Sequence, residues 1–342
     1  QSQSRDYINK FVEFERKKSS DLIEIHNRPN YLKIIEKRLN KRNYILFFHN
    51  DPLSMDGSKT VEDRKFLLKK CYRIIFNSEW SKKRFIEGLE SKFVNSEKLN
   101  VFFQSAKKGN LNIIKDKKKW ITFVGKLNKA KGYDIFGEAI VKVLNKNNDW
   151  SAKIVGDEKR EKIEFSHKNL NKLGFLNHKQ VLNLFKKTSI AVVCSRWEEP
   201  FGRTSLEAAA NGCAVIISNR GGLPETITNA IILKDVSSKE LADRINELIN
   251  DKKKRTELQK LSINNFYLSH KYVSKLIDNY RDIKIGKVKK FFTVKKKLPL
   301  RILHITNFNE RLDGRLFFNT GRRINNGFVR LGHSVLGFSD RD

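Results

Sequence analysis

Short, almost continuously apolar runs alternate with longer, lysine-rich amphipathic runs through most of the chain. Apolar runs of about four to six residues, rich in β-branched and aromatic side chains, are typical of strands buried on both faces of a parallel sheet. A regular alternation of such strands with helices predicts a doubly wound α/β protein. The expected strands are Leu22–His26, Tyr44–His49, Arg73–Ser78, Trp120–Gly125, Ala152–Gly156, Ile190–Ser195 and Ala214–Ser218.

A polar, basic stretch without periodicity, residues 106–119, separates the first three expected strands from the next four. It predicts a first domain over residues 1–108 and a second over residues 109–265, each large enough for an ordinary core. An apolar-periodic run over residues 266–283 predicts one closing helix. Residues 284–300 are lysine-rich and irregular, which predicts a basic linker.

Positive charge dominates the composition, with 70 Lys and Arg against 38 Asp and Glu and a net charge of +32. The positive electrostatic field of such a surface favours binding of a polyanion, for example nucleic acid, an anionic membrane surface or a phosphorylated substrate. The alternative is a compositional bias in which lysines only coat solvated helices. No apolar stretch approaches the about 18 to 20 residues of a membrane span, and no signal pattern is visible. We therefore expect a cytoplasmic protein that at most contacts the inner membrane face.

The three cysteines, Cys71, Cys194 and Cys213, lie in or beside apolar segments. None has the spacing of a paired metal ligand. We expect buried thiols in a reducing compartment.

The densest motif is EEPFGRTSLEAAANGCAVIISNRGGLPE, residues 198–225. Glu199 lies in a turn that leads into a helix, and Glu207 follows about two turns along that helix. Taken alone, two acidic residues near a helix start complement the helix dipole. The complete string instead resembles the donor site of family 4 retaining glycosyltransferases. That resemblance implies a GT-B fold, with two Rossmann-like doubly wound domains, the N-terminal one incomplete here.

The resemblance assigns roles to this motif. It implies that Glu199 contacts hydroxyl groups of the transferred sugar and that Glu207 holds the ribose hydroxyls. Free N–H groups at the helix start form a site for the donor diphosphate, as helix N-termini do for anions. The remaining donor-binding candidates are Phe201, Gly202, Arg203 and Thr204.

A second motif, WITFVGKLNKAKGYDIF, covers residues 120–136. It resembles the strand, glycine and paired basic residues that open the second domain of the same family. Gly125 ends the strand, Lys126 stands where the family usually has Arg, and Lys131 matches the second basic position. Two cations can balance the charge on a departing nucleoside diphosphate without a metal ion. Lysine keeps the charge at the first position but lacks the bidentate fork of arginine.

Smaller matches lie between the two motifs. Gly156, Phe175 and Leu176 occur in segments that resemble the loops lining the nucleobase, although ordinary strand-end turns explain them nearly as well. At the end of the first motif, Gly221 to Glu225 resembles an element whose glycine pair permits a tight loop near the diphosphate.

Two histidines end strands in the first half, at His26 and His49. Open α/β sheets bind ligands outside the carboxyl ends of their strands. The resemblance implies that His49 contacts the donor sugar or the acceptor, and His26 is an acceptor-side candidate. A lone loop histidine is otherwise more often only solvated. The segment expected to connect the two domains departs from the family's pattern, because residues 101–109 lack its usual Asn-Gly loop.

The expected activity is a metal-independent, cofactor-free transfer of a sugar, with retention, from a nucleotide-diphosphate-sugar to an acceptor hydroxyl. Related enzymes often act on lipopolysaccharide cores, lipid-linked sugars or other envelope glycans, which suits a basic face at an anionic membrane. The rival hypothesis is a non-enzymatic polyanion-binding protein with nucleic acid as its ligand. No nucleic-acid-binding motif occurs, so we do not expect a nucleic-acid partner.

The tail, residues 301–342, reads as strand, glycine-containing loop, helix and strand, which is how a Rossmann-like domain begins. The first residue is Gln1, and the resemblance makes Leu22–His26 a middle strand of its domain. We therefore expect a fragment of a tandem enzyme, in which the tail starts a second GT-B N-terminal domain. In the alternative, the tail folds back and docks parallel to Leu22–His26 as a permuted piece of the first domain.

Overall fold

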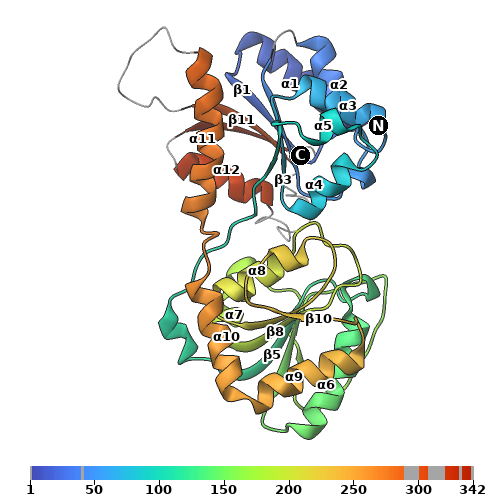
Figure 1. Ribbon diagram of the computed structural model, residues 1–342, viewed down its shortest axis with the longest axis vertical. Helices are drawn as coiled ribbons and strands as arrows, with labels where there is room; N and C mark the ends of the chain where they lie inside the picture. The colour runs from blue at the N-terminus through green and yellow to red at the C-terminus, as the bar shows by residue number, and fades with distance from the viewer. Residues whose placement is uncertain (1, 40–41, 289–299, 307–319, 331–332, 340–342) are drawn as a thin grey trace. The chain divides into compact units, whose positions relative to one another are not determined.

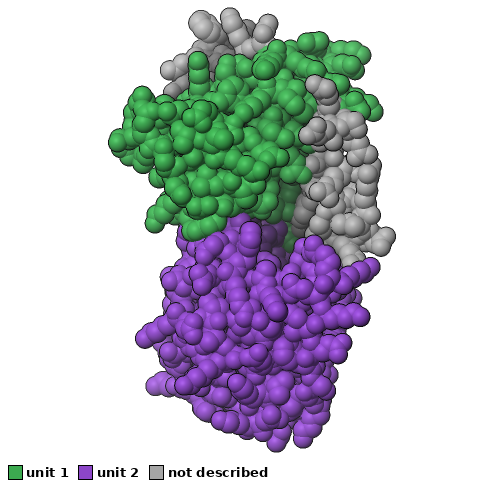
Figure 2. All heavy atoms as spheres, turned by 90° about the vertical axis from the view of Figure 1, so that its right-hand side faces the viewer, with its two compact units in different colours: residues 1–103, 271–342 green, residues 104–270 purple. Residues whose placement is uncertain are grey.

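The computed structural model describes the whole chain except residues 1, 40–41, 289–299, 307–319, 331–332 and 340–342. The described residues form two compact units (Figure 1, Figure 2). The first unit contains residues 1–103 and 271–342, and the second unit contains residues 104–270.

The boundary between the units lies after residue 103 rather than after residue 108 as expected. The N–H group of Ala106 donates to the carbonyl oxygen of Leu268 over 3.0 Å, and that of Gly109 donates to Ala210 over 2.7 Å. These backbone bonds tie the expected linker to the second unit. The closing helix begins at His270 and not at residue 266, because the preceding residues run beside Ala106.

The first unit is built around a parallel sheet of six strands in the order β12-β11-β1-β2-β3-β4. The strands are β1 (Leu22–His26), β2 (Tyr44–Phe48), β3 (Arg73–Phe76), β4 (Leu99–Val101), β11 (Arg301–Thr306) and β12 (Ser334–Ser339). Every residue of β1 and β2 is buried, as continuous apolar strands require when both faces of the sheet are covered.

The helices of the first unit are α1 (Ser2–Lys17), α2 (Pro29–Arg38), η1 (Pro52–Ser54), α3 (Val61–Lys70), α4 (Glu79–Ile86), α5 (Ser91–Val94), α11 (His270–Val288) and α12 (Thr320–Arg330). Polar residues before three of these helices accept from backbone N–H groups of the first turn: Asp51 at η1, Thr60 at α3 and Ser78 at α4. Thr60 and Asp63 together form a capping box at α3.

The C-terminal strands β11 and β12 extend this sheet beyond β1. Leu22 lies opposite Ile302 and Ile25 opposite Ile305 in the parallel pair of β1 and β11, and β12 pairs with the other side of β11. The expected strand-helix-strand order of the tail is confirmed. The tail is not a separate module in this structure. Its strand β11 docks parallel to β1, as the alternative of a folded-back tail expects. The physical reason is that an unpaired edge at β1 would leave a row of backbone groups unsatisfied.

Helix α11 lies beside β11 and α12 in Figure 1, although it is distant in sequence from β1. Arg281 of α11 donates two hydrogen bonds, of 2.6 and 2.9 Å, to the carboxylate of Glu24 on β1. Its guanidinium also stacks 3.9 Å from the ring centroid of Phe328 on α12. Arg281 and Glu24 are fully buried. One buried ion pair thus connects the N-terminal strand, α11 and the tail.

The second unit contains another parallel sheet of six strands, in the order β10-β9-β8-β5-β6-β7. The strands are β5 (Lys118–Val124), β6 (Ser151–Val155), β7 (Leu170–Lys172), β8 (Thr188–Val193), β9 (Ala214–Ser218) and β10 (Ile231–Leu233). The helices are η2 (Leu111–Ile114), η3 (Lys129–Lys131), α6 (Tyr133–Lys146), α7 (His178–Lys187), α8 (Arg203–Ala210), η4 (Leu223–Glu225), α9 (Ser238–Asn250) and α10 (Lys252–Asn264).

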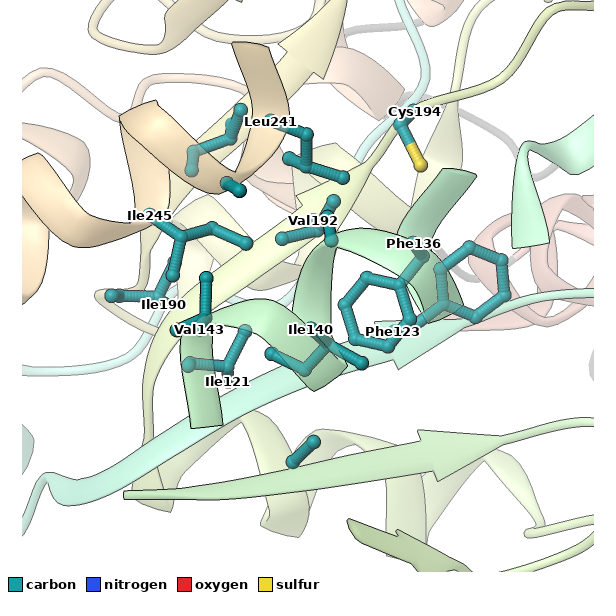
Figure 3. Close-up of a cluster of buried hydrophobic side chains, with 14 of the residues drawn as sticks. Ile121, Phe123, Phe136, Ile140, Val143, Ile190, Val192, Cys194, Leu241 and Ile245 are labelled. Carbon is teal, nitrogen blue, oxygen red and sulfur yellow. The ribbon is translucent and has the colours of Figure 1, made fainter. Parts of the chain in front are cut away.

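The main core of the second unit lies between the sheet and helices α6 and α9 (Figure 3). Phe123 of β5 and Phe136 of α6 pack with ring centroids 5.1 Å apart, and Ile245 of α9 joins the same cluster. Burying one such side chain contributes about 1.5 to 3 kcal/mol. This packing fixes the strand ends on which the site is built.

All three cysteines are buried and free, as expected. None of the helices in the described ranges is long and apolar enough to cross a membrane.

Candidate functional site

Strand β5 lies between β6 and β8 in the second sheet, so the strand order reverses at the β5/β8 pair. The crevice outside the carboxyl ends of strands at such a switch point is where open α/β sheets bind ligands. The segment from Gly125 to Lys131 follows β5, and Glu199 follows β8. The fold therefore brings the two sequence motifs to one place.

Glycines hold the loops after β5 and β6 together. The N–H group of Gly125 donates to Val155 over 3.0 Å, and that of Gly156 donates to Gly174 over 2.9 Å. Gly156 has a φ of +134°, and a Cβ atom there would lie 1.8 Å from the carbonyl oxygen of Gly125. Only glycine permits this approach at residue 156, so the loops after β5 and β6 lie backbone against backbone.

The two predicted lysines differ in their surroundings. Lys126 is exposed, and no ion pair involves it within the described part of the chain. Lys131 ends the short helix η3, where the side chain of Asn128 accepts from its N–H group over 3.0 Å. Gly132 follows with a φ of +70°, and a Cβ atom there would lie 2.0 Å from the carbonyl oxygen of Cys194. The loop that carries Lys131 is thus locked against the end of β8.

Lys131 and Glu199 form an ion pair between the two motifs. The hydroxyl group of Ser195 donates to the same carboxylate oxygen, Oε1 of Glu199, over 2.7 Å. The Glu199 carbonyl oxygen accepts from Gly222 over 2.7 Å. The Glu199 side chain is 11% exposed and that of Lys131 is 33% exposed. A predicted sugar-binding carboxylate and a predicted diphosphate-binding ammonium group thus neutralise each other in this structure.

Helix α8 begins directly after Gly202, which has a φ of +103° and provides no side-chain cap. The first N–H groups of a helix have no partner within the helix and point along its axis. Thr204 is partly buried in this first turn. Phe201 is 2% exposed and its ring packs in the interior; its donor-binding role stays a prediction.

Glu207 lies further along α8 and is 7% exposed. Its Oε1 atom accepts from Nη2 of Arg203 over 2.6 Å and lies 3.1 Å from Nε2 of His178. Burial alone would raise the pKa of Glu207, but the charge of Arg203 and the hydrogen bond from His178 outweigh burial and lower it. Glu207 is therefore held as a carboxylate.

His178 was not among the residues expected from the sequence. It is the first residue of α7, and its ring reaches the carboxylate of Glu207 on α8. A signal for it does exist: Asn177 and Gln180 form a capping box, which marks a helix start directly after the loop at Leu176. A histidine at such a start, next to a strand-end loop, is well placed to face the site.

The two nucleobase-binding candidates in the loop between β7 and α7 differ in their exposure. Phe175 is 45% exposed, whereas Leu176 packs partly against an apolar cluster beneath α8. Trp197, which the sequence analysis did not single out, is 57% exposed two residues before Glu199. The nucleobase-binding roles of Phe175 and Leu176 stay predictions.

His49 of the first unit follows β2, and its backbone is fixed by asparagines. The side chain of Asn27, a residue in the left-handed region with a φ of +60°, accepts from the N–H group of His49 over 3.0 Å. The side-chain amide of Asn77 donates to the His49 carbonyl oxygen over 3.0 Å. Asn27 also accepts from the N–H group of Asn50 over 3.2 Å.

His26 ends β1 and lies directly behind His49. Nδ1 of His26 is 3.0 Å from Nε2 of His49. His26 is 1% exposed, which does not suit the direct contact with an acceptor that the sequence suggested. His49 itself is half-buried.

Comparison with known proteins places this site in context. Residues 105–264 match the family model described as Glycosyl transferases group 1. The chain is 28% identical over 289 residues to spore coat protein SA of Bacillus subtilis strain 168, covering 75% of this chain and 76% of that protein. It is 28% identical over 214 residues to an uncharacterized 41.2 kDa protein in cps region of Klebsiella pneumoniae, covering 57% and 58%. The crystal structure of Anabaena HepE in complex with UDP and glucose matches with a TM-score of 0.61 and 18% identity, covering 83% and 81%.

Two Rossmann-like units with parallel sheets, and structural neighbours that share them, define the GT-B fold. Residues 105–264, which match the Glycosyl transferases group 1 model, lie in the second of these units.

Proposed function

We propose that the chain is a retaining, metal-independent glycosyltransferase of family 4 that uses a nucleoside diphosphate sugar as donor. The observation that carries this proposal is the meeting of Lys131, Glu199 and the start of α8 at the β5/β8 switch point of the group 1 domain. The complex of HepE with UDP and glucose supports a donor of this class.

In this proposal, Lys126, Lys131 and the first turn of α8 bind the diphosphate. Departure of a nucleoside diphosphate concentrates negative charge at its phosphate oxygens, and fixed cations and N–H groups stabilise that charge without reorganising. The left-handed conformation of Gly202 lets the diphosphate approach the helix start closely.

The two glutamates divide the rest of the donor between them. Glu199 accepts hydrogen bonds from hydroxyl groups of the transferred sugar, and Glu207 accepts from the ribose hydroxyls. Arg203 and His178 keep Glu207 oriented and ionised. Phe175 offers an exposed ring to the nucleobase. Positioning and charge stabilisation supply most of the rate enhancement.

We propose a glycan or lipid-linked acceptor in cell-envelope polysaccharide or lipopolysaccharide synthesis, with His49 in contact with a hydroxyl group of the sugar or the acceptor. Similarity to a spore coat protein and to a protein in a cps region supports this class. The net charge of +32 suits work at an anionic membrane surface from the cytoplasmic side.

Binding of the complete chain to UDP, GDP and their sugars, measured by calorimetry with EDTA and with Mn²⁺, tests this proposal. We expect one nucleoside diphosphate and its sugars to bind equally well in EDTA. Donor binding that strictly requires Mn²⁺ or Mg²⁺ would contradict the proposed diphosphate site.

The net charge of +32 also favours a second candidate, a polyanion-binding protein. Titration with duplex DNA at about 50 and 200 mM salt separates the two, because binding through phosphate contacts weakens by orders of magnitude over this range. Tight DNA binding together with no affinity for any nucleotide sugar would favour the second candidate.

A further inference from the structure

An indole ring and two lysines cluster on one face of the second sheet, at the amino end of β5. Lys118 and Trp120 are two residues apart on β5, so their side chains lie on the same face. Lys153 lies on the neighbouring strand β6, opposite Thr122 in the parallel pair. Nζ of Lys118 is 5.0 Å from the centroid of the Trp120 ring, and Nζ of Lys153 is 4.9 Å from it. Two ammonium groups thus share one aromatic ring.

The side of β6 and β7 that carries the cluster is largely open to solvent. On the opposite side, Ala152 and Ile154 of β6 pack into the core with α6 and α9. Of the residues that the structure describes, only Val155 of β6 and none of β7 join the apolar cluster beneath α7 and α8. Lys118 is exposed and Trp120 is half-buried. A ligand can therefore reach the cluster.

Neither ammonium group of the cluster forms an ion pair with a carboxylate within the described part of the chain. Burial, and then the positive charge of Lys118, lower the pKa of Lys153. The side-chain oxygen of Asn171 on β7, a neutral group, accepts from Nζ of Lys153 over 2.5 Å. By contrast, Lys119, whose side chain points to the other face, pairs with Asp149. Like charges on neighbouring strands repel each other, and a bound anion removes this repulsion.

We propose that Lys118, Trp120 and Lys153 form a binding site for a negatively charged sugar of a glycan. The two ammonium groups bind its carboxylate or phosphate group, and the exposed part of the indole ring packs against the C–H face of the sugar ring. The site lies at the amino end of β5, whereas the donor-site loop at Gly125 follows the carboxyl end. Its use, to hold an anionic acceptor glycan, rests on the proposed function, whereas the binding itself does not.

The size of the cluster favours one charged sugar over other polyanions. Single-stranded nucleic acids bind in grooves where cations follow several successive phosphates and several aromatic rings stack on the bases. Peripheral attachment to a membrane commonly uses apolar side chains that project from an amphipathic helix. Here two cations surround a single half-buried ring on a sheet face, which fits one anionic group attached to one sugar ring.

Indole ¹H–¹⁵N spectra of the complete chain observe this site directly. The chain has four tryptophans, and Trp120→Phe assigns the signal of Trp120. Oligogalacturonate supplies carboxylates, and phosphorylated mannan oligosaccharides supply phosphates. We expect at least one of them to shift the Trp120 signal in a saturable manner, whereas uncharged maltohexaose leaves it unchanged. A Trp120 signal that neither charged glycan shifts would overturn the proposal.

Two pairs of substitutions separate this site from the general positive charge of the protein. Lys118→Gln with Lys153→Gln should weaken calorimetric affinity for the charged glycan about fivefold or more. Lys252→Gln with Lys253→Gln is the matched control, because both lysines are exposed at the start of α10 and the net charge changes equally. The control should change the affinity less than about twofold, since screening limits distant charges. Equal weakening by both pairs would overturn the proposal.

Single-stranded DNA and vesicles of phosphatidylglycerol and phosphatidylcholine test the other occupants at physiological ionic strength. A Trp120 signal that responds to the DNA or the vesicles, but to neither charged glycan, would overturn the proposal in favour of that occupant. Absence of any donor binding, together with a saturable glycan shift at Trp120, would defeat the proposed function and leave this site standing.

Discussion

Replacing Glu199 by Gln should change donor binding and turnover in opposite directions. In the structure, the Glu199 carboxylate neutralises Lys131, the ammonium group that we propose for the diphosphate. A diphosphate must therefore compete with Glu199 for Lys131. Glutamine has nearly the same shape and can still accept from Ser195, but it has no charge with which to hold Lys131.

The size of the effect follows from the exposure of the pair. With 33% of the Lys131 side chain and 11% of the Glu199 side chain exposed, the pair is partly screened, and such pairs contribute about 0.5 to 1 kcal/mol. Releasing Lys131 should therefore tighten nucleoside diphosphate binding about two- to fivefold. Transfer from the nucleotide sugar should instead slow about tenfold or more, because a neutral amide binds sugar hydroxyls more weakly than a carboxylate does.

Calorimetric titration with UDP, or with GDP if the unmodified protein prefers it, measures the first quantity, and initial rates measure the second. Glu198→Gln is the matched control, because Glu198 is the adjacent glutamate and pairs with Arg220 instead of Lys131. The control should change the affinity by less than about twofold. Equal or weaker diphosphate binding by the Glu199→Gln protein would refute the reasoning, since the ion pair would then not oppose the ligand.

Glu207→Gln should weaken nucleoside diphosphate affinity about tenfold with a smaller change in kcat, because charged hydrogen bonds to ribose are replaced by neutral ones. Calorimetry measures the affinity, and steady-state rates measure kcat. Because the pKa of Glu207 is lowered from 4.5, the stability that it contributes is complete above pH 4.5 and is lost as the pH falls through the lowered value. Denaturant unfolding between pH 7 and 3 should therefore show a smaller acid loss for Glu207→Gln, and an equal loss in both proteins would contradict the assignment. Arg281→Met should lower the free energy of unfolding of the first unit by about 3 to 5 kcal/mol, because Glu24 is left buried and unpaired, and adding Glu24→Leu should restore part of it. A single Arg281 variant as stable as the double variant would argue against a buried ion pair.

The sequence predicted strands best where burial is complete. Leu22–His26 and Ala214–Ser218 are confirmed at both ends, because a nearly continuous apolar run between polar residues marks a strand clearly. The edge strands β4, β7 and β10 were missed. Each has three residues, which is too short for any periodic pattern.

Contacts between distant segments could not be predicted in the same way. The motifs predicted Lys131, Glu199 and Glu207 as neighbours of a ligand, but not that Lys131 pairs with Glu199 or that His178 reaches Glu207. Such pairings depend on rotamers and loop geometry, which local sequence does not encode. The docking of the tail depends on the same kind of information, since the apolar run of β11 fits any parallel sheet edge.

The most direct test of the account is product analysis with the donor that the chain binds. Incubation with that nucleotide sugar and a candidate envelope glycan, followed at early times by ¹H NMR, reports the release of nucleoside diphosphate and the configuration at the anomeric carbon. The account predicts release at the same rate with and without EDTA, with the new glycosidic bond in the configuration of the donor. An inverted product, or transfer that EDTA abolishes, would contradict it.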